Sequence, residues 1–236
     1  MIYIILSMLL GLCLGSFFNV TVSRENWVSG RSRCDACGHE LKWFELIPVI
    51  SFLALRGKCR YCKEKISTNH LFAELLMGFG CGVVAICGFD MWEKIMAYIA
   101  VIILGYNAIS DMHDKYTNSL VVYAGIICIA VIKLINYQFA MPGVAINTAI
   151  YLMFAAMCYL TSITASRYVG AGDYEIIFLL FLCSRAYSLI IFFSIIVTSV
   201  YMMLVNKKVT EGKTVAFVPY LYIGYLISIL IGGSSL

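Results

Sequence analysis

The sequence predicts an all-α membrane protein with about eight transmembrane segments and a small polar domain between the first and the second. Of its 236 residues, 62% are hydrophobic and only 13% are charged, whereas soluble domains carry about 25% charged residues. Several uncharged runs approach the roughly 20 residues that a helix needs to cross a bilayer. Helices are expected because backbone groups in lipid must bond within their own segment, and no run alternates like a barrel strand. This composition argues against a soluble enzyme, a disordered chain and a nucleic-acid-binding protein.

The first predicted span is the uncharged run at residues 1–23. It lacks the basic start and the small-residue cleavage site of a secretory signal peptide, so we expect it to be retained as a helix. Seven further apolar runs follow the polar domain; one of them contains Pro142 and Gly143, and another is about half a span long. These runs cover residues 75–89, 95–110, 116–132, 134–166, 176–184, 186–206 and 214–236.

The polar domain is expected at residues 24–70. This stretch holds nine of the 17 Lys and Arg residues and four of the ten cysteines. A polar domain of about 45 residues builds little apolar core, so we expect a bound metal to supply folding energy. The predicted organisation is therefore a first helix at 1–23, a zinc-binding domain at 24–70 and a membrane helical bundle at 71–236.

The distribution of basic residues predicts the orientation in the membrane. With eight spans and the N-terminus outside, 14 of the 17 Lys and Arg residues fall in loops that face the cytoplasm. The opposite side receives Lys94, Lys133 and Arg185. Since cytoplasmic loops carry an excess of Lys and Arg, the polar domain is expected in the cytoplasm. The predicted spans are expected to lie in the lipid bilayer.

Two cysteine pairs predict a metal centre in the polar domain. Cys34 and Cys37 form one CxxC pair, and Cys59 and Cys62 form a second, with 21 residues between the pairs. Two such knuckles place four thiolates around one tetrahedral Zn²⁺. Gly38 suits the tight turn of a knuckle, and the basic residues nearby favour thiolates.

Two alternatives concern the ligands of this centre. In the first alternative the four cysteines form two disulfides. A cytoplasmic location disfavours this alternative, because that compartment keeps thiols reduced. In the other, His39 or His70 replaces a cysteine, although four cysteines already complete a tetrahedral shell.

Two carboxylates at segment ends are the candidate catalytic pair. Asp111 ends the run at 95–110, and Asp173 ends the tetrad GAGD, which contains Gly170 and Gly172. Two carboxyl groups held together share a proton, so one acts as general base on water and the other as acid toward a carbonyl. The glycines allow close backbone approach, and we expect an unwound segment there that lines a cavity.

Other interpretations of the carboxylates stay open. Each aspartate alone fits a helix end at the membrane interface, and Asp111 has Lys115 four residues on as an ion-pair partner. Asp114 is the alternative to Asp111 as the first catalytic acid. Glu74 either pairs with a basic side chain of the polar domain or serves the site.

Seven segments together resemble the bacterial type IV prepilin peptidases, the leader peptidase/N-methyltransferases of the GxGD intramembrane aspartyl protease family. The resemblance covers nearly the whole chain, and its cysteine segments are the most specific part. It rests on GSFFNV at 15–20 with Arg24, RSRC and CGH within 31–39, LIPVIS at 46–51, RGKCRYC at 56–62, Glu74, GAGD at 170–173 and FVPYL at 217–221.

The chain departs from the family pattern in three places. The segment from Asp111 to residue 118 is one residue shorter than the family's, and Thr117 stands where proline is usual. Glu175 stands where lysine is frequent, and Val218 replaces a glycine.

The resemblance implies a bifunctional enzyme of the bacterial cytoplasmic membrane. Its protease cuts the short basic leader from type IV prepilins and pseudopilins after a glycine, using two aspartates and no metal. The same protein methylates the new N-terminal residue with S-adenosylmethionine, and the zinc domain is linked to that activity. No glycine-rich nucleotide fingerprint defines the methyl-donor residues. The alternatives are a non-catalytic membrane scaffold with a zinc ribbon, and a proton-coupled transporter that uses the same acids.

Overall fold

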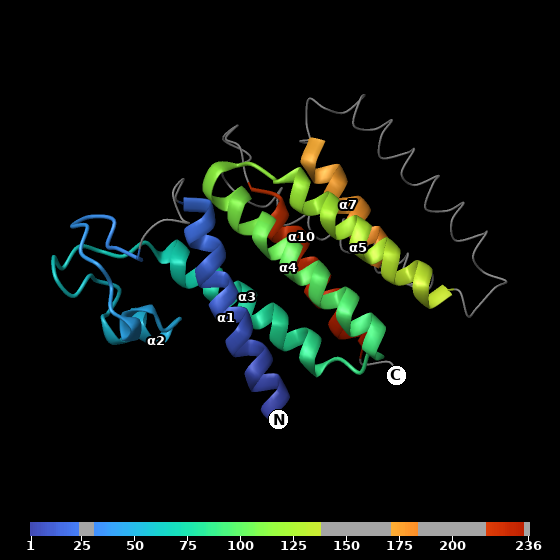
Figure 1. Cartoon of the computed structure of the whole chain (residues 1–236), viewed down its shortest axis with the longest axis horizontal. Coiled ribbons are helices and arrows are strands. Elements are labelled where there is room, and N and C mark those ends of the chain that lie inside the picture. Colours follow the sequence, from blue (N-terminus) through green and yellow to red (C-terminus); the bar gives the residue numbers. More distant parts are fainter. Residues whose placement is uncertain (24–30, 138–170, 184–215, 234–236) are drawn as a thin grey trace. The chain divides into compact units, whose positions relative to one another are not determined.

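The computed structural model describes residues 1–23, 31–137, 171–183 and 216–233 (Figure 1). Every regular element in these ranges is a helix, and two isolated β-bridges are the other backbone pairings. The chain forms two compact units, Met1–Ile86 and Cys87–Leu236. The predicted all-α class is therefore confirmed for the described part of the chain.

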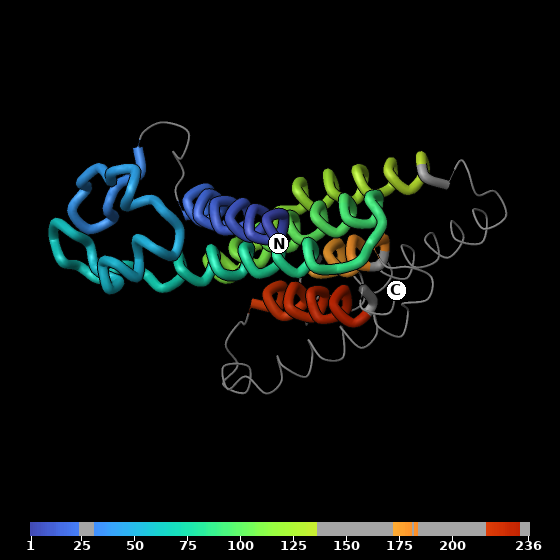
Figure 2. Tube along the Cα trace, turned by 90° about the horizontal axis from the view of Figure 1, so that it is seen from below, coloured from blue at the N-terminus to red at the C-terminus, as the bar shows by residue number. Residues whose placement is uncertain are grey.

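The first unit consists of two long helices and the cysteine-containing domain between them. Helix α1 covers Ile2–Ser23 and α3 covers Thr68–Ile86. Between them the domain holds the short 3-10 helix η1 at Trp43–Leu46 and the one-turn helix α2 at Ile50–Ala54. Both views show α1 and α3 side by side, with the domain at the ends where the chain leaves α1 and enters α3 (Figures 1 and 2).

Small residues allow α1 and α3 to pack closely. The buried residues of α1 are Ser7, Gly11, Gly15 and Asn19, a stripe with a spacing of four. A Cβ atom at Gly11 would come within 2.9 Å of Cys81 Cβ. Because lipid provides no hydrophobic drive between helices, such stripes associate by close van der Waals packing.

The second unit is built around α4. Helices α4 (Met91–Asp114), α5 (Ser119–Tyr137), α7 (Ala171–Cys183) and α10 (Val218–Gly233) are its described elements. α4 contacts the other three, and α7 also packs against α5 and α10. The group at its centre is apolar and includes the fully buried side chains of Leu104, Val122 and Leu179.

The two ends of α4 are defined by specific residues. Asp90 is the N-cap, and its side chain accepts a hydrogen bond from the Glu93 N–H at 2.8 Å. At the other end Lys115 adopts a left-handed conformation with φ 57°, and its N–H donates to the Asp111 carbonyl. This C-cap turns the chain immediately after Asp114, one helical turn beyond Asp111, and leads it into α5.

Three of the described helices, α1, α3 and α4, are long and apolar enough to cross a membrane. α5 and α10 are apolar as well, but their qualifying stretches are shorter. The predicted run at 186–206 lies outside the described residues, as does the run at 134–166 apart from its first four residues, which belong to the end of α5. The structure thus supports an integral membrane protein, and the number of eight spans stays a prediction.

Two helix starts differ from the expectation. α3 begins at Thr68 rather than near residue 75, so His70 and Glu74 lie on its first turns. α7 begins at Ala171, which places Gly172 and Asp173 in its first turn rather than in an unwound segment. An apolar run shows which part of a helix lies in lipid. These two helices start earlier than their apolar runs, because their first turns consist of polar residues that contact other parts of the protein.

The packing of α1 on α3 predicts the effect of enlarging Gly11. Gly11→Val places a branched side chain against α3 and is expected to destabilise the protein by about 1–3 kcal/mol. Leu10→Val introduces the same residue at a neighbouring position that is 61% exposed, and it should leave stability nearly unchanged. Thermal unfolding of the purified proteins in detergent measures both, and equal melting temperatures would contradict this packing.

Candidate active site and metal centre

The cysteine domain contains two copies of one backbone turn. In the first, the Cys34 N–H donates to the His39 carbonyl and Arg33 bridges to Glu40. In the second, the Cys59 N–H donates to the Glu64 carbonyl and Lys58 bridges to Lys65. Each turn passes through a left-handed residue directly after the CxxC pair, with φ 71° at Gly38 and 63° at Lys63. The expected role of Gly38 in a knuckle turn is therefore confirmed.

The two turns bring the four cysteine sulfurs together. The Sγ atoms of Cys34, Cys37, Cys59 and Cys62 all lie within 4.8 Å of one another. The Cys34 and Cys62 sulfurs are 3.9 Å apart, close to the edge of about 3.8 Å in a tetrahedron with Zn–S bonds of about 2.3 Å. This separation is far longer than the roughly 2.05 Å of a disulfide. The four thiols thus fit a tetrahedral metal centre.

Hydrogen bonds within the cluster favour the ionised form of one thiol, that of Cys59. The backbone N–H groups of Cys62 and Tyr61 point at the Cys59 sulfur and lower the pKa of that thiol to about 7. At Cys62 the backbone N–H of Glu64 favours the thiolate, but desolvation and the three neighbouring thiols outweigh it and raise its pKa to about 11. Several thiolates at such short distances repel one another, so a cation between them would stabilise the cluster.

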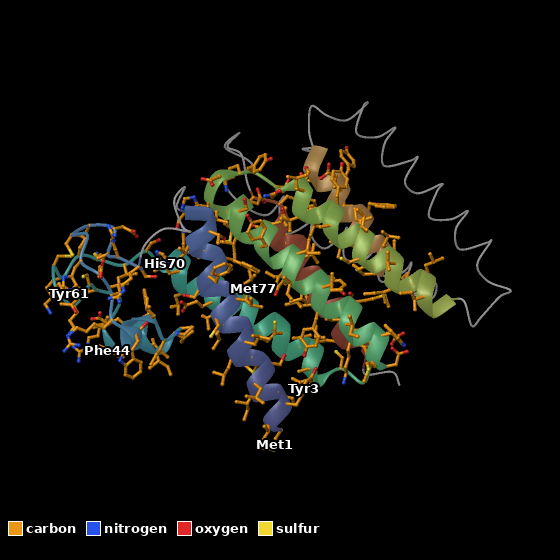
Figure 3. All side chains as sticks on the ribbon, viewed as in Figure 1. Met1, Tyr3, Phe44, Tyr61, His70 and Met77 are labelled. Carbon is orange, nitrogen blue, oxygen red and sulfur yellow. The ribbon has the colours of Figure 1, made fainter. Side chains whose placement is uncertain are left out.

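The two histidines considered as replacement ligands lie outside the sulfur cluster. The His39 ring stacks on Tyr61, with ring centroids 3.6 Å apart. His70 lies at the start of α3, where its Nδ1 is hydrogen-bonded to the Asn19 side chain at the end of α1 (Figure 3). This contact ties the two helices together at the point where the cysteine domain is inserted.

Glu74 has a partner that the sequence analysis did not consider. Its carboxylate is buried and accepts a hydrogen bond from the Val49 N–H at 2.7 Å, and no ion pair joins it to a basic side chain of the described residues. Val49 has φ 63°, an unusual conformation for a β-branched residue. The hydrogen bond to Glu74 holds this turn of the cysteine domain against α3.

In the second unit, Asp111 lies in the last turn of α4 and is buried, with 7% exposure. Its Oδ2 accepts a hydrogen bond from the Val218 N–H at 3.0 Å. Val218 is the first residue of α10, so the carboxyl group meets one of the unpaired N–H groups at a helix N-terminus. Lys115 donates to the Asp111 carbonyl oxygen at 3.4 Å, rather than forming the expected ion pair with the carboxylate.

Asp114 has a different environment from Asp111. Its side chain is 55% exposed and lies 2.8 Å from His113 Nδ1. The structure therefore separates the two candidates for the first catalytic acid by their burial.

Asp173 lies in the first turn of α7, and this turn packs on the connection that follows α4. A Cβ atom at Gly172 would overlap the Thr117 hydroxyl. The glycine before Asp173 therefore permits a close approach between the start of α7 and the segment three residues beyond the C-terminus of α4. Gly170, the other candidate glycine, lies outside the described residues.

Polar side chains fix the connection between α4 and α5. Asn107 is fully buried; its Oδ1 accepts from the Asn118 N–H at 2.8 Å and its Nδ2 donates to the Ile103 carbonyl at 2.9 Å. Glu175, which replaces the family's frequent lysine, accepts a hydrogen bond of 2.6 Å from the Tyr123 hydroxyl. Asn107 and the Val218 N–H were missed by sequence reasoning, although FVPYL itself was among the motifs.

These features define a multi-span membrane protein with a four-cysteine domain and a buried acid at a helix end. The profile described as "Bacterial Peptidase A24 N-terminal domain" matches residues 9–87. A prepilin leader peptidase/N-methyltransferase from Myxococcus xanthus is 36% identical over 191 residues, which are 75% of this chain and 55% of the relative. The chain thus spans about half the length of that relative. No solved structure matches the chain.

Two further relatives carry the same name and are covered more completely. The protein from Stutzerimonas stutzeri is 28% identical over 266 residues, with 98% of this chain and 91% of the relative covered. The one from Dichelobacter nodosus is 30% identical over 217 residues, with 89% and 74% covered. The chain belongs to the prepilin leader peptidase/N-methyltransferases, an enzyme family, as the motifs indicated.

The close approach of Gly172 to Thr117 predicts that substitutions at these two positions have coupled effects on stability. Gly172→Ala introduces a methyl group into occupied space and should destabilise the protein by about 1–3 kcal/mol. Thr117→Ala removes the hydroxyl that the methyl group meets, so the double variant should recover part of this loss. Thermal unfolding of the two single variants and the double variant measures the coupling. Strictly additive changes would show that the two residues do not touch.

Proposed function

We propose that this protein removes the leader peptide from prepilin-like precursors and that Asp111 and Asp173 are its catalytic pair. One observation carries the assignment: Asp111 is a buried acid at the end of an apolar helix, whereas Asp114, three residues on, is exposed. The contact between Gly172 and Thr117 supports the pairing, since it brings the turn that carries Asp173 to the connection following α4. The name shared by the relatives supports the substrate class.

In the proposed reaction the two carboxyl groups share one proton. The ionised acid takes a proton from a water molecule while that water attacks the scissile carbonyl. The protonated acid donates its proton to the carbonyl oxygen. The tetrahedral species then collapses as the acid that took the water proton passes it to the leaving amine, while the hydroxyl formed from the carbonyl oxygen returns its proton to the other acid. The Val218 N–H holds one oxygen of Asp111 in place.

The proposed orientation fits the charge of such a substrate. A basic leader stays in the cytoplasm while the apolar part of the precursor lies in the membrane, so its cleavage point lies at the cytoplasmic interface. Of the Lys and Arg residues, 14 fall on that side if the N-terminus is outside. Acids at the cytoplasmic ends of helices would meet the cleavage point there.

The proposed second activity is methylation of the new N-terminus, with S-adenosylmethionine as the donor. When bound, this cofactor supplies a methyl group on a positively charged sulfur. We further propose that Cys34, Cys37, Cys59 and Cys62 hold a structural Zn²⁺, which would fold the domain next to α1 and α3 and take no part in proteolysis.

Single substitutions test the catalytic pair. Asp111→Asn keeps an oxygen that accepts from the Val218 N–H but loses the ability to exchange a proton. Asp111→Asn and Asp173→Asn should each reduce leader removal by about 10²–10⁴-fold, and the double variant should be little worse because the acids act as a unit. Asp114→Asn is the matched control and should cleave nearly normally. The assay is cleavage of a pilin precursor in membranes.

The outcomes of this assay separate three accounts. If Asp114→Asn loses cleavage and Asp111→Asn does not, the first catalytic acid has been assigned to the wrong residue. If all of the variants cleave like the unmodified protein, the protease proposal falls. A protein that processes no precursor at all and still binds pilus or secretion components would instead be a zinc-ribbon scaffold.

Metal analysis tests the zinc proposal. The purified protein should contain about one zinc per chain, and replacing both Cys34 and Cys37 by serine should remove it. The domain should then become sensitive to proteolysis, because the metal supplies its folding energy. Cys13→Ser, at an exposed position of α1, is the control that keeps its zinc. A metal-free protein with four readily modified thiols in the domain would contradict the proposal.

A further inference from the structure

Two short helices of the cysteine domain, η1 and α2, expose large apolar side chains. The residues concerned are between 43% and 78% exposed, and within each helix they are three positions apart, so they share one face. η1 and α2 also contact each other. We call this set the η1–α2 face; it consists of Trp43, Leu46, Ile50 and Leu53. An apolar surface of this kind marks contact with a membrane or with another protein.

Contacts with α1 and α3 fix the level of the η1–α2 face along these two helices. The N–H of Val49, between η1 and α2, donates to the Glu74 carboxylate on α3. α1 is close at the same level, because a Cβ atom at Gly15 would lie 2.8 Å from Glu74 Cα. Glu74 directly precedes the apolar run at 75–89. The turn between η1 and α2 is therefore level with the start of the apolar part of α3.

Both long helices expose apolar side chains at this level. Phe17 on α1 and Phe72 and Leu75 on α3 are all more than 40% exposed. Since α1 and α3 are long and apolar enough to cross a membrane, these side chains are expected to face lipid. The boundary of the bilayer therefore reaches the level of Val49, and the η1–α2 face lies at that boundary.

The sequence around the η1–α2 face is basic. Residues 41–60 contain four Lys and Arg residues and one acid, Glu45, which is buried. Lys42 directly precedes η1, and Arg56 follows α2. The Arg60 guanidinium lies 5.6 Å from the centre of an aromatic ring of η1. Aromatic and apolar side chains with Lys and Arg beside them are typical of segments in the membrane interface, where the basic groups meet anionic headgroups.

We infer that the η1–α2 face is embedded in the interfacial region of the bilayer beside α1 and α3, and that its basic neighbours bind anionic lipid headgroups. The partner of this face is the lipid surface itself. The contact would hold the cysteine domain against the membrane at a second place, in addition to the ends of α1 and α3. The inference depends on α1 and α3 crossing the bilayer and goes beyond the proposed processing reaction.

Depth-dependent quenching of Trp43 fluorescence tests the inference. The chain has three tryptophans, so Trp27→Tyr and Trp92→Tyr leave Trp43 as the single fluorophore of the full-length protein. This protein is reconstituted in liposomes of phosphatidylethanolamine and phosphatidylglycerol that contain a nitroxide-labelled lipid. We expect a nitroxide near the headgroups to quench Trp43 strongly and aqueous acrylamide to quench it weakly, because interfacial segments lie about 5–10 Å into the boundary between headgroups and acyl chains.

A probe elsewhere in the same domain is the control. In the same background, Trp43→Phe combined with Tyr61→Trp moves the fluorophore to an exposed position of the second cysteine turn. Acrylamide should quench this probe strongly and the nitroxide lipid weakly. Leu53→Asp, in the protein that retains Trp43, places a charge on the η1–α2 face and should make Trp43 accessible to acrylamide. An unchanged melting temperature establishes that each variant is folded.

A Trp43 that acrylamide quenches strongly and the nitroxide lipid does not would overturn the inference. Protection from acrylamide that appears only after a prepilin-like precursor is added would also overturn it, and would assign the face to binding of the precursor. Neither result bears on the proposed function, whose failure is detected separately as a precursor that keeps its leader.

Discussion

Lipid offers no hydrogen-bond partners, so a polar group that is buried at the end of an apolar helix must find one within the chain. Asn107 satisfies this requirement at the Asn118 N–H and the Ile103 carbonyl. Asp111 satisfies it at the N-terminus of α10. In the first unit, Asn19 binds His70, and Glu74 binds the Val49 N–H. These contacts join the helix ends concerned to the segments that lie next to them.

The same requirement links stability to chemistry in both units. In the first, the polar contacts at the ends of α1 and α3 position the cysteine domain, while the small-residue stripe of α1 brings the two helices close enough for those contacts. In the second, the carboxyl group that receives the first N–H of α10 is also the proposed catalytic acid. A group placed for the helix end is thereby largely excluded from bulk water.

Local patterns in the sequence predicted local structure well. The spacing of the four cysteines is a property of two short turns, so the cluster at Cys34, Cys37, Cys59 and Cys62 followed from sequence alone. The burial of Asp111 depends on α10, more than 100 residues away, and no local pattern records that contact. The start of α7 at Ala171 likewise depends on packing. The spacing of Gly11 and Gly15 was a readable signal of helix packing that the sequence analysis did not use.

The central claim is that one protein carries out both processing steps on a prepilin-like precursor. The most direct measurement is the intact mass of such a precursor after incubation with the purified protein in liposomes. With S-adenosylmethionine present, we expect the mass to fall by that of the leader and to rise by one methyl group. Without the methyl donor, leader removal alone should occur. A precursor that keeps its full mass under both conditions would contradict the account.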